Sequence, residues 1–379
     1  MMAPSSMHIE GSIALDVAWD GMRVASVLVD SSRPLAARRV LEGRTAADAA
    51  NLVPLLFSVC GRAQAVAAAM AVTAARGEEW GHFTRQKSAL RVGVEALQEH
   101  LWRLMVDWPE RLGLPAARAS FALWHKRLAT ATESNAEQLA RELDGFVTKE
   151  LLAGLDTVRL DQVDPEWLAS GDGQGLAGSV GALLQALLHA AWRHDAGKAT
   201  APLLPPMTAA AMCEKMGAGL DDAFVRGPAL AGIAHETGAV ARQRVRPLVA
   251  RLLQAGHRIA ARVAARTVEL SELVQGLRAP QRLIEGRWLD AAPLGPGAGL
   301  AAVETARGLL LHAVWLVGAR VDRYIIVAPT EWNFHRRGAY VAELNEVAAD
   351  SLETLRQRAE ALALALDPCV GYAVSVRHA

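Results

Sequence analysis

The first part of the sequence carries an alternation of apolar and polar residues between positions 8 and 30. The apolar positions are Ile13, Leu15, Val17, Trp19, Met22, Val24 and Leu28. A period of two is typical of a strand with one buried face. The Asp20-Gly21 pair between the two halves favours a two-residue type I′ turn. The pattern therefore predicts a β-hairpin over about residues 8–30.

From about residue 45 to residue 365 the apolar residues recur at helical spacing. The predicted helices cover 48–73, as one long helix or two joined near Gly61, then 85–111, ending before Pro109, and then 117–130, 133–145, 181–194, 207–217, 238–277, kinked at Pro247, and 341–365. Two glycine-rich stretches, 170–181 and 293–300, predict loops, and 320–328 predicts a strand. We expect a mainly α protein with a small β component. Residues 1–379 would form a single domain made of the hairpin, this helical body and a C-terminal segment at 367–379.

Composition narrows the class of protein. Hydrophobic residues make up 52% of the 379 residues, and 40 basic residues face 40 acidic ones. That apolar fraction excludes low-complexity disorder. A net charge of zero argues against nucleic acid or an anionic membrane as the main partner, because binding to either needs an excess of Lys and Arg. In the stretch 242–266, arginines alternate with apolar residues at helical spacing, and we interpret them as a solvated face or a partner surface.

Three cysteines, Cys60, Cys213 and Cys369, are too few and too scattered for a disulfide framework, and they fit a reducing compartment. The first residues lack the apolar core of a signal peptide. The longest apolar stretches, 65–75 and 309–319, are shorter than the roughly 18 residues that cross a bilayer. These features predict a cytoplasmic protein without a membrane segment.

Cys60 and Cys369 are separated by more than 300 positions, so their spacing alone does not bring them together. A cysteine taken singly is more typical of an inert buried residue than of a metal ligand. We interpret Cys213, in the stretch MTAAAMCEKM, as such a core residue. His189 and His194 lie five positions apart, which does not place them on one helix face as a metal-binding pair. The interest of Cys60 and Cys369 lies in the segments that surround them.

Eight short segments are spread over the whole chain. They are IEG at 9–11, LEGR at 41–44 followed by Asp48-Ala49, LLFSVCGRAQ at 55–64, QEHL at 98–101, ETGAVAR at 236–242, ETARG at 304–308 with His312, PTEWN at 329–333 and DPCVGYAVS at 367–375. In this order they resemble the motifs of the large subunit of NiFe hydrogenases, which carry a Cys-x-x-Cys pair near each end. One such motif is weak, whereas eight in order are specific. The resemblance implies the fold of that large subunit, with an N-terminal β-hairpin and long central helices.

The resemblance also identifies what this chain lacks. In the family, four cysteine thiolates hold nickel. Here Phe57 and Tyr372 stand where two of those cysteines belong, and Gln64 and Ser375 replace two histidines. A phenyl ring cannot coordinate nickel and a phenol is a poor substitute for a soft thiolate, so no nickel is expected. The family's separate divalent-cation site is also expected to be lost, because Arg38 and Ser375 stand in place of its glutamate and histidine.

The residues that surround iron in the family's site are matched better in this chain than the nickel ligands. Cys60 occupies the position of a thiolate that bridges nickel and iron, and Cys369 that of a thiolate terminal on nickel. The resemblance implies that these two cysteines are metal ligands for an Fe(CN)2CO unit. We expect Arg307 or Arg62 to lower the pKa of a neighbouring thiol, which would favour metal binding.

Further residues match the family's pocket for the diatomic ligands. They are Arg307, Leu310, Pro329 and Thr330. Cyanide nitrogens accept hydrogen bonds, so a guanidinium and a hydroxyl suit them, and an apolar wall suits CO. Glu10 and His312 also lie in matched motifs, and we treat them as candidates for a hydrogen-bond network around the unit.

A large-subunit-like chain with half of the cysteines, and without the tail that is cleaved from hydrogenase precursors, resembles the hydrogenase maturation proteins of the HupK/HoxV type. The resemblance implies a non-catalytic scaffold or chaperone that holds the Fe(CN)2CO unit transiently. It would receive the unit from the accessory proteins that build it and pass it toward the large-subunit precursor. The alternative is a metal-free interaction protein that docks the accessory proteins or the apo large subunit. Residual hydrogenase activity is disfavoured by the missing nickel ligands.

Overall fold

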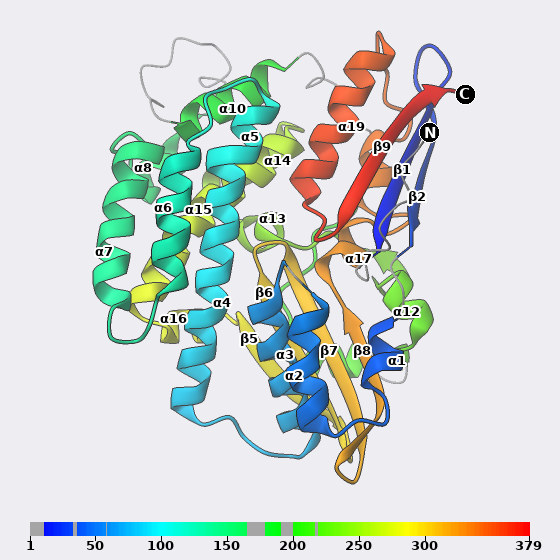
Figure 1. Ribbon diagram of the computed structural model, residues 1–379. Coiled ribbons are helices and arrows are strands. Elements are labelled where there is room, and N and C mark those ends of the chain that lie inside the picture. Colours follow the sequence, from blue (N-terminus) through cyan, green and yellow to red (C-terminus); the bar gives the residue numbers. More distant parts are fainter. Residues whose placement is uncertain (1–10, 33–35, 58, 165–178, 191–199, 217–218) are drawn as a thin grey trace, which may run out of the picture.

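The computed structural model describes residues 11–379 apart from 33–35, 58, 165–178, 191–199 and 217–218. A helical body lies beside a three-stranded and a four-stranded β-sheet (Figure 1), and a further pair of short strands forms a two-stranded sheet, so the prediction of a mainly α protein with a small β component is confirmed. The predicted glycine-rich loop at 170–181 lies outside the described residues except for its last three, which begin a helix. None of the described helices combines the length and the apolar composition that crossing a bilayer requires.

The strands are β1 (Ser12–Trp19), β2 (Val24–Ser31), β3 (Ala229–Leu230), β4 (Ile233–Ala234), β5 (Leu289–Gly295), β6 (Ala298–Thr305), β7 (Gly308–Val317), β8 (Arg320–Val327) and β9 (Gly371–His378). The helices are α1 (Ala36–Leu41), α2 (Ala46–Leu56), α3 (Gly61–Ala75), α4 (His82–Trp102), α5 (Trp108–Arg111), α6 (Arg118–Ala129), α7 (Ala136–Phe146), α8 (Thr157–Gln162), α10 (Ser179–His189), α11 (Ala209–Met216), α12 (Asp222–Arg226), α13 (Ala239–Gln243), α14 (Pro247–Gln254), α15 (Arg258–Arg278), α16 (Gln281–Glu285), α17 (Pro329–Asn333), α18 (Ala339–Leu344) and α19 (Leu352–Leu366). Two π-helical turns are η1 (Arg103–Asp107) and η2 (Val147–Leu151). The stretch 48–73 thus forms two helices that meet near Gly61, and 238–277 forms three.

The predicted N-terminal hairpin is confirmed, but it is part of a larger sheet. β9 pairs with β1 in parallel, so the strand order is β2-β1-β9 (Figure 1). The predicted two-residue type I′ turn is wrong, because four residues separate the strands and Asp20 does not adopt the positive φ that such a turn requires. Instead, Asp20 Oδ1 accepts hydrogen bonds of 2.8 Å from the N–H groups of Met22 and Arg23.

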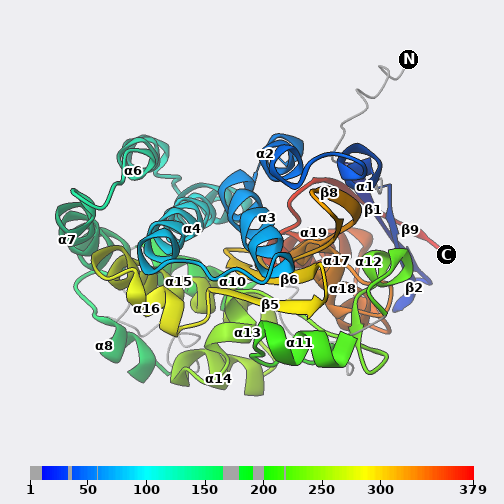
Figure 2. The ribbon, with the colours of Figure 1, turned by 90° about the horizontal axis from the view of Figure 1, so that it is seen from below.

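The second sheet is an antiparallel meander in the order β5-β6-β7-β8. The predicted loop at 293–300 is wrong, since this stretch forms the end of β5, a tight turn and the start of β6. α3 and α11 lie on opposite sides of these strands (Figure 2), so β6 and β7 are buried on both faces and lack the alternation that reveals a strand. Gly299 is needed by this packing, because a Cβ at that position would lie 2.4 Å from the backbone oxygen of Ala71.

The predicted end of the helix before Pro109 is also wrong. α4 continues through η1 into α5, which ends at Arg111. Pro109 lies in the first turn of α5, where a missing N–H is tolerated. The π-helical turn changes the pattern of backbone hydrogen bonds just before the proline. It also carries Arg103, which contacts the buried carboxylate of Asp367.

The N-terminus of α3 is stabilised by a carboxylate from a neighbouring helix. Its N-cap residue, Cys60, makes no side-chain capping hydrogen bond. Glu95 of α4 instead accepts hydrogen bonds from the N–H groups of Arg62 (2.8 Å) and Ala63 (3.1 Å). Burial raises the pKa of Glu95 to about 7, although these two hydrogen bonds lower it. The helix that begins at Cys60 is therefore fixed to α4 by a group that titrates near neutral pH.

The interpretation of the arginine-rich stretch as a solvated face or a partner surface is wrong for the arginines at its C-terminal end. Arg262 and Arg266, on α15, are only 3% and 5% exposed. Arg262 donates hydrogen bonds to Glu236 (2.7 Å) and Glu343 (3.0 Å), and Arg242 donates to Glu269 (2.6 Å). A buried charge is tolerated when it is paired and hydrogen-bonded. The arginines can lie in the core because buried acids neutralise them. These acids come from other segments of the chain, so the arginine-rich stretch alone does not reveal them.

The ion pairs of Arg262 give a prediction for stability. We expect Arg262→Met to lower the free energy of unfolding by about 3 kcal/mol, because Glu236 and Glu343 stay buried after losing their main cation. Arg91→Met is the matched control, since Arg91 is exposed on α4, and it should change this energy by less than about 0.5 kcal/mol. Urea unfolding followed by circular dichroism measures both. Equal effects of the two substitutions would contradict the structural role of Arg262.

Glu95 gives a prediction for pH dependence. Its folded-state pKa is above the unfolded value, so the stability it contributes is complete below about pH 4.5 and is lost as the pH rises through about 7. Between these values the free energy of unfolding of the wild type should fall by about 2–3 kcal/mol relative to Glu95→Gln, which stays neutral and keeps a capping oxygen. Urea unfolding at pH 5 and pH 7.5 tests this. If the free energy of unfolding changes with pH in the same way for the two proteins, the pKa of Glu95 is not raised by folding.

Candidate functional site

Cys60 lies in the short connection between α2 and α3 and is 6% exposed. Its carbonyl oxygen accepts the N–H of Gln64 at 2.9 Å, which starts α3. One turn into the helix, Gln64 Nε2 donates a hydrogen bond to Cys60 Sγ at 3.6 Å. The cysteine and the glutamine are four positions apart, so the helix itself aligns the amide with the sulfur.

Cys369 follows the end of α19 and is 7% exposed. The helix is terminated by Asp367, which adopts a left-handed conformation with φ of 55°. Thr330, at the start of α17, accepts the N–H of Cys369 with its Oγ1 at 3.1 Å, and the same oxygen lies 3.1 Å from Cys369 Sγ. The threonine hydroxyl is thus placed against the sulfur from the side of α17.

The two cysteines share one electrostatic environment with Arg307. Burial raises the pKa of the Cys60 thiol well above its usual range, and the charges of Cys369 and Glu95 raise it further. Arg307 and the hydrogen bond from Gln64 lower it. The predicted direction of the Arg307 effect therefore holds, but the prediction of a lowered thiol pKa is wrong because burial outweighs it. The fold brings the two cysteines close enough for the charge of one to act on the other, which their separation in sequence did not predict.

Arg307 lies in the turn between β6 and β7, where its N–H and that of Gly308 donate to Thr305 Oγ1 at 3.1 and 3.2 Å. Its Nε donates to Asp367 at 3.1 Å and its Nη2 to Glu99 at 2.7 Å. Burial opposes the charged form, but the charges of Asp367, Glu99 and both cysteines raise the pKa of Arg307. The guanidinium is held in place as a permanent cation, and no described residue accepts a hydrogen bond from its Nη1.

Asp367 is the centre of this cluster of charges. Arg266 Nη2 lies 2.8 Å from Asp367 Oδ2, and Arg103 of η1 and Arg307 both bond Oδ1. Burial alone would raise the pKa of Asp367, but the three arginines hold it far below its usual range. The carboxylate lies two residues before Cys369 and so fixes the start of the segment that carries that cysteine.

The other predicted site residues lie on β7 and α17 or outside the described residues. Leu310 is buried on β7, and Pro329 is buried next to Thr330 as the first residue of α17. His312, also on β7, is fully buried between Gln64 and Tyr324, with 2.8 Å hydrogen bonds on both sides. Glu10 and the side chain of Arg38 lie outside the described residues. Cys213 is half-buried in α11, against the second sheet, so its predicted place in the core is confirmed only in part.

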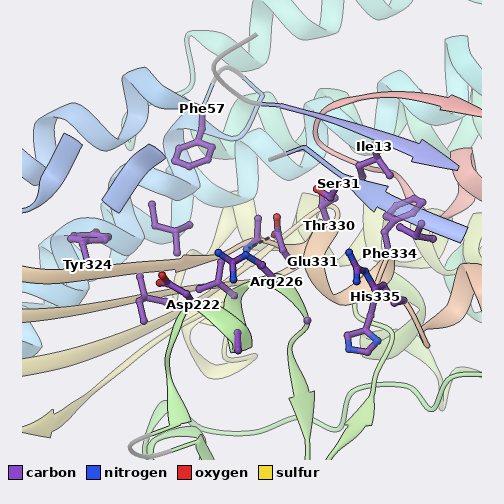
Figure 3. A pocket seen from close by; sticks show the side chains of 18 residues that line it. Ile13, Ser31, Phe57, Asp222, Arg226, Tyr324, Thr330, Glu331, Phe334 and His335 are labelled. Carbon is purple, nitrogen blue, oxygen red and sulfur yellow. Dashed lines mark hydrogen bonds between the residues drawn. The ribbon is translucent and has the colours of Figure 1, made fainter. Parts of the chain in front are cut away.

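A cavity of about 430 Å³ lies beside Thr330 (Figure 3). Phe57, at one of the positions where the hydrogenases carry a cysteine, forms part of its wall together with Tyr324, Arg226 and Glu331. Tyr372, at the other such position, lies on β9 and is 38% exposed. In the part of the chain that the structure describes, no group of three or more metal-ligating side chains is present.

Sequence reasoning missed several residues of the site. Asp367, Glu99 and Asn333 belong to the matched segments, but the motifs gave no reason to connect them with Arg307. Asn333 Oδ1 accepts the N–H of Thr237 at 2.9 Å, and its Nδ2 donates to the carbonyl of Leu366 at 3.3 Å. Glu95 lies in no matched segment. The feature of the sequence that could have identified it is a carboxylate among the apolar residues of VGVEAL. A carboxylate that is buried with such neighbours needs a hydrogen-bond partner.

Comparison with solved structures supports this fold. The Ni-Fe-Se hydrogenase of Desulfovibrio vulgaris Hildenborough is similar over 93% of this chain and 94% of its own, with a TM-score of 0.62 and 15% sequence identity. The Ni-Fe-Se hydrogenase of Desulfomicrobium baculatum gives a TM-score of 0.59 over the same share of this chain. The predicted large-subunit-like fold is thereby confirmed.

Curated proteins give a match in sequence, whereas no protein-family model matches the chain. The hydrogenase expression/formation protein HoxV of Cupriavidus necator is 32% identical over 366 residues, covering 91% of this chain and 92% of HoxV. The hydrogenase expression/formation protein HupK of Bradyrhizobium diazoefficiens is 31% identical over 379 residues, covering 99% of both chains. With this similarity over almost its whole length, the chain belongs to the family of hydrogenase expression/formation proteins that includes HoxV and HupK.

Proposed function

We propose that the protein is a non-catalytic scaffold that holds an Fe(CN)2CO unit through Cys60 and Cys369 during assembly of a NiFe hydrogenase. The observation that carries the proposal is the shared environment of the two cysteines and Arg307, which come from three distant parts of the chain. Two sulfur ligands suit a metal that binds soft ligands, and the fixed cation beside them suits a unit that carries two anionic cyanides. The unit is cargo in this proposal and not a resident cofactor.

Charge supports this assignment. A ferrous ion with two cyanides and two thiolates carries a net negative charge, and burying it requires compensating cations. The charges of both cysteines act on Arg307, and Arg103 and Arg266 contact Asp367, the carboxylate that Arg307 also binds. The guanidinium of Arg307 and the hydroxyl of Thr330 are the donors that a cyanide nitrogen could use. Leu310 and Pro329 supply the apolar wall expected around CO.

Nickel has no place in this proposal. Phe57 and Tyr372 replace two of the four thiolates that the hydrogenases use, and Phe57 carries no donor atom. The proposed partners are the accessory proteins that build the iron unit and the large-subunit precursor that receives it. Such an exchange takes place where those proteins are made, so we propose a cytoplasmic location.

The proposal predicts a spectroscopic signature. Protein purified anaerobically from cells that make the hydrogenase should contain iron without nickel and show CO and CN stretching bands in the infrared. Cys60→Ser and Cys369→Ser should each abolish the bands, because one remaining thiolate cannot hold the unit. Cys213→Ser is the matched control, as it removes a thiol on α11, outside the site, and should leave the bands intact. If the wild type lacks these bands while the accessory proteins are active, the proposal is wrong.

A metal-free interaction protein is the second candidate. The observation that favours it is the raised pKa of the Cys60 thiol, because burial keeps this group protonated unless a metal displaces the proton. In this reading the cysteines are core residues, and the protein acts by docking the accessory proteins or the apo large subunit.

Hydrogenase maturation in cells separates the two candidates. The double variant Cys60→Ala/Cys369→Ala should lower hydrogenase activity at least tenfold if the protein carries iron, with protein levels matched by immunoblot. Normal maturation with the double variant would establish the metal-free function. Thr330→Val, which keeps the shape of the side chain and removes the hydroxyl beside Cys369, should give an intermediate loss only if the cargo is bound.

A further inference from the structure

Four buried side chains form a continuous hydrogen-bonded chain that begins on the Cys60 sulfur. Gln64 Nε2 lies 3.6 Å from Cys60 Sγ, His312 Nε2 lies 2.8 Å from Gln64 Oε1, and Tyr324 Oη lies 2.8 Å from His312 Nδ1. Gln64 and His312 are fully buried, and Tyr324 is 2% exposed at the wall of the cavity shown in Figure 3. The chain crosses from α3 through β7 to β8, so its members are set by the packing of the helix on the sheet.

The direction of donation in this chain follows from the number of donors. If Gln64 donates to the sulfur, its oxygen accepts Nε2–H of His312, and Nδ1 of His312 accepts the hydroxyl proton of Tyr324. Each hydrogen bond of the chain then joins one donor to one acceptor, and the S–H of the free thiol, a weak donor, is left without an acceptor in the chain. If the direction is reversed, with the thiol donating to Gln64, His312 donates to Tyr324, and the tyrosine hydroxyl has no acceptor among the described residues. An unpaired buried O–H costs more than an unpaired S–H, and a metal-bound thiolate has no S–H at all, so the first direction is favoured.

Titration does not disturb this arrangement near neutral pH. Burial lowers the pKa of His312 to about 3 and raises the pKa of Tyr324 above its usual range. The amide of Gln64 has no proton to lose. The imidazole therefore stays neutral and the phenol stays protonated, while the amide can accept from one side and donate to the other at the same time.

We infer that Gln64, His312 and Tyr324 form a one-way hydrogen-bond chain that directs an N–H donor at the Cys60 sulfur and positions it for that sulfur as a metal-bound thiolate. The inference rests on the proposed function for the identity of the metal but not for the direction of the chain. Gln64 acts on the sulfur directly, and His312 and Tyr324 are positioning residues that hold its amide in the donating orientation. A hydrogen bond to an anionic sulfur is stronger than one to a neutral thiol, so the chain favours the bound state over the free thiol.

The direction of the chain can be measured without any metal. Nitrogen-15 NMR of protein labelled at histidine should show His312 as the Nε2–H tautomer, with Nδ1 unprotonated, and the signals should not move between pH 5 and pH 8. The His312→Gln variant assigns the resonance by its loss. An Nδ1–H tautomer would mean that His312 donates to Tyr324, and it would overturn the inference regardless of what the protein carries.

The effect on the sulfur can be measured with Co²⁺ as a probe, added to the full-length protein under anaerobic conditions. We expect Gln64→Leu to weaken Co²⁺ binding about tenfold, the order of one hydrogen bond to a charged group, and to move the sulfur-to-cobalt charge-transfer band to longer wavelength. Tyr324→Phe should shift the band in the same direction by less. Gln98→Leu is the matched control, because this buried glutamine donates to the carbonyl of His125 and is not part of the chain.

The outcomes separate this inference from the proposed function. If Gln64→Leu and Gln98→Leu have the same charge-transfer band and the same affinity for Co²⁺, the chain has no role in metal binding and the inference is overturned. A wild-type protein without any cobalt–thiolate band would contradict the proposed function, and the tautomer of His312 would still decide the direction of the chain. Loss of stability alone cannot imitate a shifted band, because that band reports only molecules that hold the metal through sulfur.

Discussion

Asp367 carries a buried negative charge that three arginines neutralise, and the position of the candidate site depends on this interaction. The three cations come from η1, α15 and the turn between β6 and β7, so one carboxylate joins the long helical body, the second sheet and the end of α19. Removing a carboxylate from water is unfavourable unless such partners are present, and the arginines in turn lose part of their charge compensation without it. The geometry of Arg307 and of the segment that carries Cys369 is therefore set by the same interaction.

Burial also decides which parts of the molecule could be predicted from sequence. The hairpin and most helices could be predicted because each buries one face, and a period of two or of about 3.6 records that burial. β6 and β7 could not, since α3 and α11 cover both sides of the second sheet and no alternation remains. β9 was missed because only one of its residues is buried. The arginines of α15 were misread because helical spacing shows which residues share a face but not what covers that face.

The candidate site could also be predicted only in part. Its residue types could be taken from the resemblance to a known family, since short motifs preserve identity and order. Their proximity could not, because contacts such as those of Asn333 with Thr237 and Leu366 join segments far apart in the chain. Nor could the electrostatic balance be predicted. Arg307 lowers the pKa of Cys60 as expected, but burial has the larger effect, and burial depends on the complete fold.

The parallel pairing of β9 with β1 has a consequence for the order of events in the cell. β1 lies near the beginning of the chain, yet its neighbour is formed by residues 371–378. During synthesis, that edge of the N-terminal hairpin stays uncovered until residues 371–378 have been made, and contacts between residues so far apart in sequence slow folding. Cys369 emerges immediately before this strand. No nascent fragment that stops short of Cys369 contains both sulfurs, so a ligand that needs both can be captured only after synthesis has passed that residue.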